Sequence, residues 1–339
     1  GLVSVNTQLD TWLNGSVFPL KLSGSDAPSE NHIRHVAATF AGDEPAGESS
    51  WQLHLDFQAY NFSYIPIETL SMIYEQFLHA PEIEADRDEK HPKPTKGERA
   101  GAYYTPIPVV NFMLAEMAER KPLKRGMKIC DASCGSGAFL VQCYRRLVET
   151  EFPPGKPKPA PYQLKQLLQQ SIFGVDLDPD ACSVTELSLV LTLLDYVDPP
   201  DLDDNPRFQL PTLRGENIFK ADFFQPKPPV SELLGHRKFD WIVGNPPWKQ
   251  LKSASLDDED KHVWSWMQAN KDQCPVGKYQ TAQAFVWRCR DFVKSDGECG
   301  LLMPAMSLFE DPSKAFRAAF FRACRVHTVE RVCHSRNHW

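Results

Sequence analysis

The segment with the clearest chemical potential is Phe239-Asp-Trp-Ile-Val-Gly-Asn-Pro-Pro-Trp248, where an apolar strand pattern runs directly into an asparagine, two prolines and a tryptophan. Two consecutive prolines cannot extend a central strand and carry no N–H groups, so they predict a stiff turn that displays carbonyl oxygens. The Asn245 side-chain oxygen and the Pro246 carbonyl are two acceptors for the hydrogens of an –NH2 group, and Trp248 offers a stacking face. A purely structural turn with a surface tryptophan is the alternative. The candidate catalytic residues are Asn245, Pro246, Pro247 and Trp248.

A second candidate site is Asp131-Ala-Ser-Cys-Gly-Ser-Gly-Ala-Phe139, which follows a short apolar run and opens a helical pattern. Gly135 and Gly137 let the backbone approach a ligand, and the helix N-terminus adds amide donors. A tight strand-to-helix turn also needs glycine without any ligand. The segment lacks the third glycine of a dinucleotide fingerprint, and the Asp131 carboxylate would repel a pyrophosphate. The pattern therefore favours a ligand with a cationic group.

Three further carboxylates follow ordered stretches of the chain. Asp176 ends the strand pattern 172–176, where a carboxylate can accept hydrogen bonds from ribose hydroxyls. Asp178 stands directly before a proline, so we expect it to cap the next helix. Asp222 precedes two phenylalanines and could accept the amine of an adenine lying against them. Taken alone, a loop aspartate beside core phenylalanines is the simpler interpretation of Asp222.

The elements that would position these residues alternate in the rhythm of β–α–β units. Strand patterns occupy 127–131, 172–176, 239–243 and 299–303, and helical spacing occupies 107–119, 137–149, 163–170, 179–195, 280–294 and 313–323. Proline-rich connections at 153–161, 199–211 and 226–229 interrupt the rhythm. We predict an α/β fold with a doubly wound, mostly parallel, Rossmann-like sheet.

The first hundred residues differ from the rest of the chain in hydrophobic patterning and composition. Residues 1–60 are weakly patterned apart from a strand signature at 51–57, and helical spacing returns over 66–78. Residues 80–100 carry acids, bases and prolines with almost nothing apolar. The sequence thus predicts a small N-terminal extension with a helical lead-in (1–79), a charged linker or mobile loop (80–100) and a catalytic domain (101–339).

Composition and charge narrow the class of protein. The 339 residues are 42% hydrophobic and 24% charged, which excludes wholesale disorder. No apolar run approaches the roughly 18 residues of a membrane-spanning helix, and no signal-peptide pattern is visible. Nine cysteines without a CxxC pair indicate reduced thiols in a cytoplasmic protein and no metal cluster. The net charge of −7 excludes a uniformly basic nucleic-acid coat, but 313–339 hold six Lys/Arg against one acid, a stretch that suits either a polyanion or a solvated helix face.

In type and order, these motifs resemble the catalytic domain of amino-group DNA methyltransferases of the gamma arrangement. Gly101-Ala-Tyr-Tyr-Thr-Pro-Ile-Pro-Val-Val-Asn-Phe-Met113 is similar to the upstream motif of that family, and the segment 63–77 resembles the lead-in of restriction–modification and phage-defence methylases. The resemblance covers about residues 64–325. It implies that S-adenosyl-L-methionine is bound by Tyr104, Thr105, Pro106, Asp131, Ser133, Gly135, Gly137, Phe139, Asp176, Leu177, Asp222 and Phe223.

The resemblance also implies a reaction and a partner. The expected activity is methylation of the N6 amino group of adenine in double-stranded DNA, with the adenine flipped out of the helix and the methyl group transferred directly, within a restriction–modification or phage-defence system. Open alternatives are N4 of cytosine, a protein glutamine amide, and a non-catalytic cofactor-binding scaffold. Because the family continues with further strands and a target-recognition domain, we expect the catalytic domain to be truncated near Trp339 and that domain or subunit to be missing from this chain.

Overall fold

A five-stranded parallel sheet forms the centre of the computed structural model, which describes residues 66–78, 101, 103, 105–198 and 208–332 together with positions 29, 31, 34 and 97. The expected strand at 51–57, the expected linker at 80–100 apart from position 97, and Tyr104 lie outside the described residues. The strands are β1 (Ile129–Asp131), β2 (Ile172–Asp176), β3 (Ile218–Lys220), β4 (Phe239–Gly244) and β5 (Val293–Leu301). The helices are α3 (Glu68–Leu78), α5 (Ile107–Arg120), α6 (Ala138–Glu151), α7 (Pro161–Ser171), α8 (Pro179–Leu194), α10 (Val230–Leu233), α11 (Lys261–Asn270), α12 (Thr281–Cys289), α13 (Met306–Phe309) and α14 (Lys314–Ala323).

The strand order β3-β2-β1-β4-β5 confirms the predicted doubly wound sheet. The chain builds outward from β1 to β3 and then crosses back to lay β4 on the other side of β1. The order therefore reverses between β1 and β4, and in open α/β sheets such a switch point leaves a crevice at the carboxyl ends of the strands. Both Asp131 and the residues after Gly244 lie at that edge, because Asp131 pairs with Val243.

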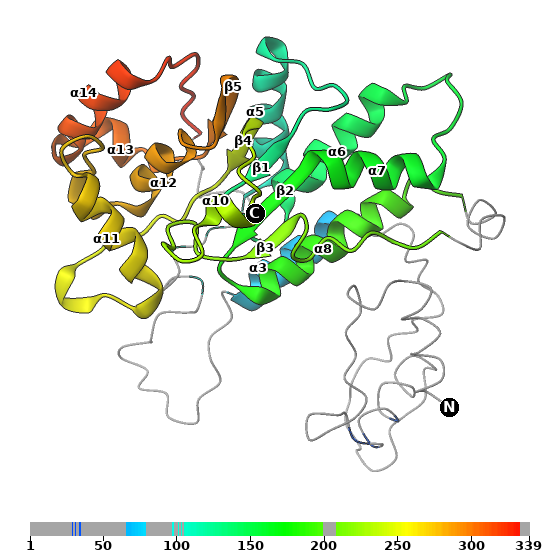
Figure 1. Cartoon of the computed structure of the whole chain (residues 1–339), viewed down its shortest axis with the longest axis horizontal. Helices are drawn as coiled ribbons and strands as arrows, with labels where there is room; N and C mark the ends of the chain where they lie inside the picture. The colour runs from blue at the N-terminus through cyan, green and yellow to red at the C-terminus, as the bar shows by residue number, and fades with distance from the viewer. Residues whose placement is uncertain are drawn as a thin grey trace, which may run out of the picture.

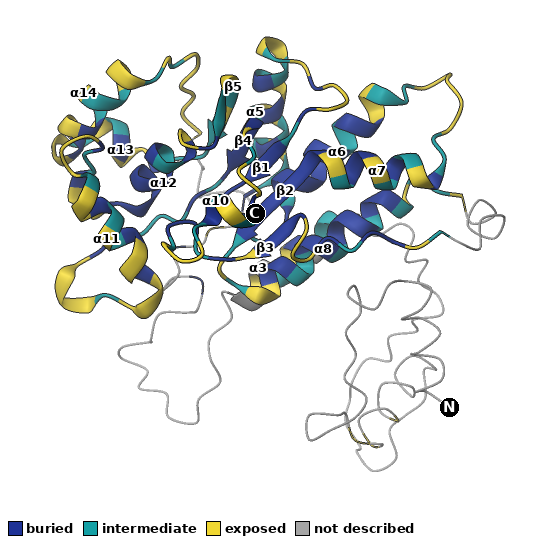
Figure 2. Ribbon diagram, viewed as in Figure 1, coloured by how far each residue is buried: buried dark blue, intermediate teal, exposed yellow. Residues whose placement is uncertain are grey.

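Helices cover both faces of the sheet (Figure 1). On one face α5, α6, α7 and α8 pack against apolar side chains of the strands, including Ile129, Ile172 and Trp241. On the other face α10, α11 and α12 pack against the alternate strand positions, including Phe173 and Ile242. Figure 2 shows the sheet and the inner helix faces as one buried block. Burial on both faces explains why the central strands read as continuous apolar runs.

Local sequence explains where the elements that carry the site begin. Asp178 caps α8 as predicted, since its side chain accepts a hydrogen bond from the N–H of Asp180, and a proline occupies the first helical position. The start of α6 needs Gly137, whose φ of 87° lies in the left-handed region. The lead-in helix α3 packs against α8.

The structure corrects the boundaries predicted near the C-terminal end of the sheet. The strand expected at 299–303 runs from Val293 to Leu301, and the helix expected over 280–294 ends at Cys289. The reason is that β5 is an edge strand with half-buried and exposed positions, so it needs no apolar run. The short strand β3 and the helix α11 were not assigned from the sequence. Among the described residues, no helix is long and apolar enough to span a bilayer.

Candidate active site

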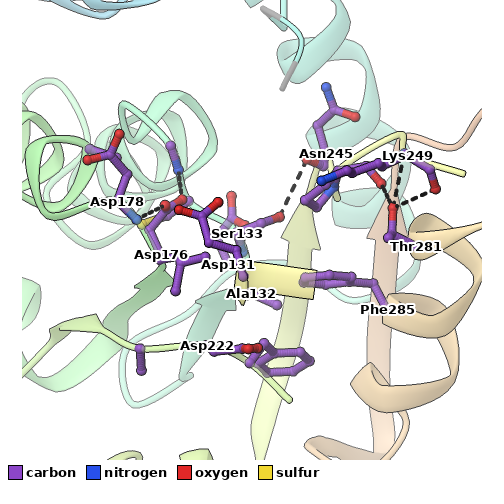
Figure 3. Close-up of a pocket in the computed structure, with 18 of the residues that line it drawn as sticks. Asp131, Ala132, Ser133, Asp176, Asp178, Asp222, Asn245, Lys249, Thr281 and Phe285 are labelled. Carbon is purple, nitrogen blue, oxygen red and sulfur yellow. Dashed lines mark hydrogen bonds between the residues drawn. The ribbon is translucent and has the colours of Figure 1, made fainter. Parts of the chain in front are cut away.

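A cavity of about 710 Å³ lies at the carboxyl ends of the strands, on the switch point of the sheet (Figure 3). Most of the candidate site residues line it: Thr105, Asp131, Ser133, Gly135, Phe139, Asp176, Leu177, Asp222, Phe223, Asn245 and Pro247. The remaining described candidates, which do not line it, are Pro106, Gly137, Pro246 and Trp248. The fold thus brings five segments that are far apart in the chain to one cavity.

Those four candidates have other surroundings. Pro106 is the N-cap of α5, and its carbonyl accepts backbone N–H groups of that helix. Gly137 faces Thr185, whose hydroxyl oxygen would lie only 3.0 Å from an added Cβ atom. Pro246 is buried between two residues that do line the cavity, Asn245 and Pro247. Gly137 and Pro106 therefore support the residues that line the cavity without lining it themselves.

Asp131 is a buried carboxyl group at the end of β1. Its Oδ1 accepts a hydrogen bond from the Ser133 N–H at 3.0 Å. Burial raises the pKa of Asp131 to about 8, partly against that hydrogen bond and with a smaller contribution from the nearby Asp176 charge. Gly244 leaves room for this carboxylate, because a Cβ atom there would lie 2.5 Å from Oδ1. A cationic ligand group in the cavity would favour the ionised form of Asp131.

Asp176 ties the glycine turn to the end of β2. Its Oδ2 accepts the Gly135 N–H at 2.8 Å, and its Oδ1 accepts the Asp178 N–H at 2.9 Å (Figure 3). Burial raises the pKa of Asp176, while the hydrogen bonds from backbone N–H groups oppose the rise. From the other side, the Thr185 hydroxyl donates to the Gly135 carbonyl at 2.7 Å. The turn is thus held in one conformation by side chains from two other segments.

Asp222 and Phe223 form the far wall of the cavity. The Phe224 N–H donates to Asp222 Oδ1 at 2.8 Å, and His262 Nδ1 lies 2.8 Å from Oδ2. The Phe223 ring stacks on Phe285, with centroids 5.5 Å apart and planes inclined by 15°. Neither His262 nor Phe285 was among the residues singled out from the sequence, since both come from helices packed on this wall only by the tertiary fold.

The lead-in helix α3 also contributes to the cavity. Tyr74 lines it and donates its hydroxyl hydrogen to Asp178 Oδ2 at 3.1 Å. One turn earlier, the Ser71 hydroxyl donates to the Ser136 carbonyl, 3.3 Å away in the glycine turn. The α3 helix therefore contacts both the glycine turn and the segment after β2.

Asn245 follows the last residue of β4 and has a fixed side-chain amide. Its Nδ2 donates to the Tyr103 carbonyl at 3.1 Å and contacts the Thr105 hydroxyl at 3.1 Å. Because a carbonyl can only accept, this contact settles which end of the amide is nitrogen. The Asn245 Oδ1 atom is buried and accepts no hydrogen bond from the described part of the chain. No hydrogen bond from the described residues reaches the Pro246 carbonyl either.

The aromatic groups beside Asn245 are arranged differently from the sequence interpretation. Trp248 donates its backbone N–H to the Gly101 carbonyl at 2.9 Å and its indole N–H to the Leu302 carbonyl at 3.4 Å. Its ring packs on Tyr103, with centroids 5.3 Å apart. Tyr103 lines the cavity and is 52% exposed, whereas Trp248 is half-buried and outside the lining. The accessible aromatic face next to Asn245 therefore belongs to Tyr103, which the sequence analysis quoted within its motif without assigning it a role.

The sequence pattern of the N-6 DNA methylase family matches residues 67–335. The chain belongs to this family. Among its relatives, the type II restriction enzyme and methyltransferase RM.Eco57I of Escherichia coli is 25% identical over 301 residues, which is 78% of this chain and 29% of that protein. The adenine-specific methyltransferase PglX of Streptomyces coelicolor is 26% identical over 197 residues, 50% of this chain and 15% of that protein. This N-6 DNA methylase chain thus spans less than a third of the length of either relative.

Solved structures of similar fold agree with the observed architecture. A DrdV–DNA complex superposes with a TM-score of 0.54 at 17% identity, over 78% of this chain and 25% of the other. The type ISP restriction-modification enzyme LlaBIII bound to DNA superposes with a TM-score of 0.53 at 14% identity, over 90% of this chain and 21% of the other. These likenesses support the fold.

S-adenosyl-L-methionine is the cofactor that family membership implies, and the cavity has the donor set for it. Asp131 suits the amino group of the cofactor, and Asp176 lies where a carboxylate meets ribose hydroxyls. Asp222 and Phe223 combine an acceptor with an aromatic wall, which suits an adenine ring and its amine. The residues present therefore fit the cofactor.

Proposed function

We propose that this N-6 DNA methylase chain transfers a methyl group to the N6 amino group of adenine in double-stranded DNA, with the adenine flipped into the cavity, as part of a restriction–modification or phage-defence system. The observation that carries the proposal is the buried Asn245 Oδ1 atom, which lacks a hydrogen-bond donor among the described residues while the other end of the same amide is fixed. A buried polar atom without a partner is costly, so its retention at a cavity indicates a ligand donor. An exocyclic amine supplies such a donor.

The cofactor half of the cavity binds and orients. Asp131, Asp176 and Asp222 would hold the amino group, the ribose and the adenine of S-adenosyl-L-methionine. When bound, this cofactor supplies a methyl group on a positively charged sulfur. The protein needs no covalent nucleophile for direct transfer to an amine, and Cys134 fits a structural role because burial raises its pKa well above the ordinary thiol value.

The other half would hold the target base. Asn245 Oδ1 and the Pro246 carbonyl would each accept one hydrogen of the adenine amine, which makes its nitrogen more electron-rich and fixes its direction of attack. Flipping a base costs a few kcal/mol, and stacking on the exposed Tyr103 ring would offset part of that cost.

DNA as the substrate is supported by two independent features. One relative is named a type II restriction enzyme and methyltransferase, and another is named an adenine-specific methyltransferase. The C-terminal segment of the described chain also exposes basic side chains, namely Lys314, Arg322, Arg325 and Arg331. A local basic surface on an acidic protein suits the phosphate backbone.

The proposal is tested by incubating the protein with methyl-labelled cofactor and unmethylated plasmid DNA, digesting the DNA to nucleosides and the protein to peptides, and analysing both digests by mass spectrometry. We expect labelled N6-methyladenine. Labelled N4-methylcytosine, or label only in protein glutamine, would mean that Asn245 and Pro246 bind a different amino group. Binding of the cofactor by calorimetry without transfer to any of the three would indicate a scaffold and overturn the proposal.

A further inference from the structure

Thr281, the first residue of α12, forms hydrogen bonds with the turn at 245–249. The sequence analysis assigned no role to Thr281. Thr281 lies 36 residues downstream of Asn245 in the chain, yet it lines the same cavity and is only 3% exposed. Figure 3 shows its side chain pointing at the backbone next to Lys249. No other described side chain donates a hydrogen bond to the backbone carbonyls of residues 246–249.

Thr281 forms hydrogen bonds with backbone groups of both Pro247 and Lys249 in this turn. Its hydroxyl lies 2.5 Å from the Pro247 carbonyl and donates to it, while the same oxygen accepts the Lys249 N–H at 3.0 Å. The Thr281 backbone N–H donates to the Lys249 carbonyl at 2.9 Å. One residue thus satisfies three backbone groups that follow the catalytic asparagine.

The two prolines explain why the turn needs such a partner. Neither has an N–H, so the turn cannot close on itself through these residues, and both ring systems already fix φ. After Pro246, the backbone torsion that the rings leave free is ψ of Pro247. This angle sets the direction in which the Pro247 carbonyl points. The Thr281 hydroxyl fixes the direction of the Pro247 carbonyl, whereas the neighbouring Pro246 carbonyl accepts no hydrogen bond from the described residues.

We propose that Thr281 is a positioning residue for methyl transfer: its hydroxyl sets the geometry of the Asn-Pro-Pro turn and thereby the alignment of the target amine. This inference rests on the proposed function. It predicts that the hydroxyl matters for the rate of transfer and not for cofactor binding, because the Thr281 hydroxyl contacts neither the glycine turn nor the carboxylates of the cofactor half.

The test compares Thr281→Val, which keeps the shape and removes the hydroxyl, with Thr281→Ser, which keeps the hydroxyl. We expect Thr281→Val to lower the single-turnover rate of labelled methyl transfer to plasmid DNA by at least about tenfold, because the Pro247 carbonyl loses its donor. Affinity for S-adenosylhomocysteine, measured by calorimetry, should change by less than about twofold. Thr281→Ser should return the rate to within about threefold of the unmodified protein.

A matched control is Thr192→Val in α8. Thr192 is fully buried, and its hydroxyl donates at 2.7 Å to the Ser188 carbonyl of its own helix, away from the cavity lining. This variant loses a buried threonine hydroxyl in the same way, so its thermal stability should fall comparably while its transfer rate stays unchanged. A rate loss in Thr281→Val alone would separate alignment from general destabilisation.

Hydrogen exchange gives a readout that does not depend on activity. Thr281→Val should speed amide exchange in a peptide covering residues 245–251, whereas Thr281→Ser and Thr192→Val should leave that peptide protected. Unchanged transfer and exchange in Thr281→Val, or an equal loss of cofactor affinity and rate, would overturn the inference. If the unmodified protein methylates no DNA, the proposed function fails, and unchanged exchange in Thr281→Val would then reject the Thr281 inference separately.

Discussion

The acceptor groups in the two halves of the cavity differ in whether they accept hydrogen bonds from the protein. In the cofactor half, Asp131, Asp176 and Asp222 each accept a hydrogen bond from the backbone N–H group two residues further along the chain. In the substrate half, Asn245 Oδ1 and the Pro246 carbonyl accept none from the described residues. The carboxylates of the cofactor half are thus held by the main chain itself, whereas two acceptors of the substrate half have no donor among the described residues. Substitutions in the two halves should therefore affect different steps.

The largest effect is expected from Asn245→Ala. The substitution removes the unpartnered acceptor, so the transfer rate should fall on the order of 100- to 1000-fold, as for loss of a donor or acceptor aimed at the reacting group. Affinity for S-adenosylhomocysteine, measured by calorimetry, should stay within about twofold because no cofactor-half carboxylate contacts Asn245. Near-normal transfer by this variant would remove the distinction between the halves.

Asp176→Asn should produce the complementary defect. An amide has one acceptor oxygen, so it cannot serve both the Gly135 and Asp178 N–H groups, and the turn loses one charge-assisted bond. We expect cofactor affinity to weaken roughly 10- to 100-fold. The transfer rate at saturating cofactor should stay near normal, which single-turnover measurements would check. A large rate loss at saturation would instead mean that the halves are not separable.

Tyr103→Ala tests which aromatic ring serves the substrate half. Base stacking on an aromatic ring contributes about 1–3 kcal/mol, so loss of the exposed Tyr103 ring should raise KM for DNA about tenfold. Tyr103→Phe keeps the ring and should behave like the unmodified protein. The steady-state KM for plasmid DNA measures the difference, and an unchanged value for Tyr103→Ala would leave Trp248 as the stacking residue.

The smallest effect is a pH dependence that belongs to the cofactor half. Asp131 has a pKa of about 8 in the folded protein, above its ordinary value of 3.8, so folding stability should fall as pH rises from about 4 to about 8 and level off above it. The cationic cofactor amine favours the ionised carboxyl group, and the ionised fraction rises about fivefold from pH 7 to pH 8. Cofactor affinity by calorimetry should follow this rise, and Asp131→Asn should abolish it. A flat profile in the unmodified protein would mean that Asp131 is already ionised below pH 7.

The features that the sequence predicted well are those with a local signature. The strand 172–176 has the bounds expected, because a strand buried on both faces is an apolar run that ends at a polar residue. The Asn-Pro-Pro turn and the glycine turn were recognisable for the same reason, since proline and glycine dictate backbone geometry locally. The rest of the site could not be read this way. Thr281 reaches the cavity, and His262 reaches the Asp222 carboxylate, only through tertiary packing, and nothing in their own neighbourhood in the sequence signals these contacts.

The hydrogen bonds of α3 have a practical consequence for shortened forms of this chain. Ser71 and Tyr74 each hold a segment that forms the cofactor wall, so a protein shortened to start at Gly101 would lose one side of that wall along with the helix. A shortened protein that keeps both hydrogen bonds therefore has to begin ahead of Glu68.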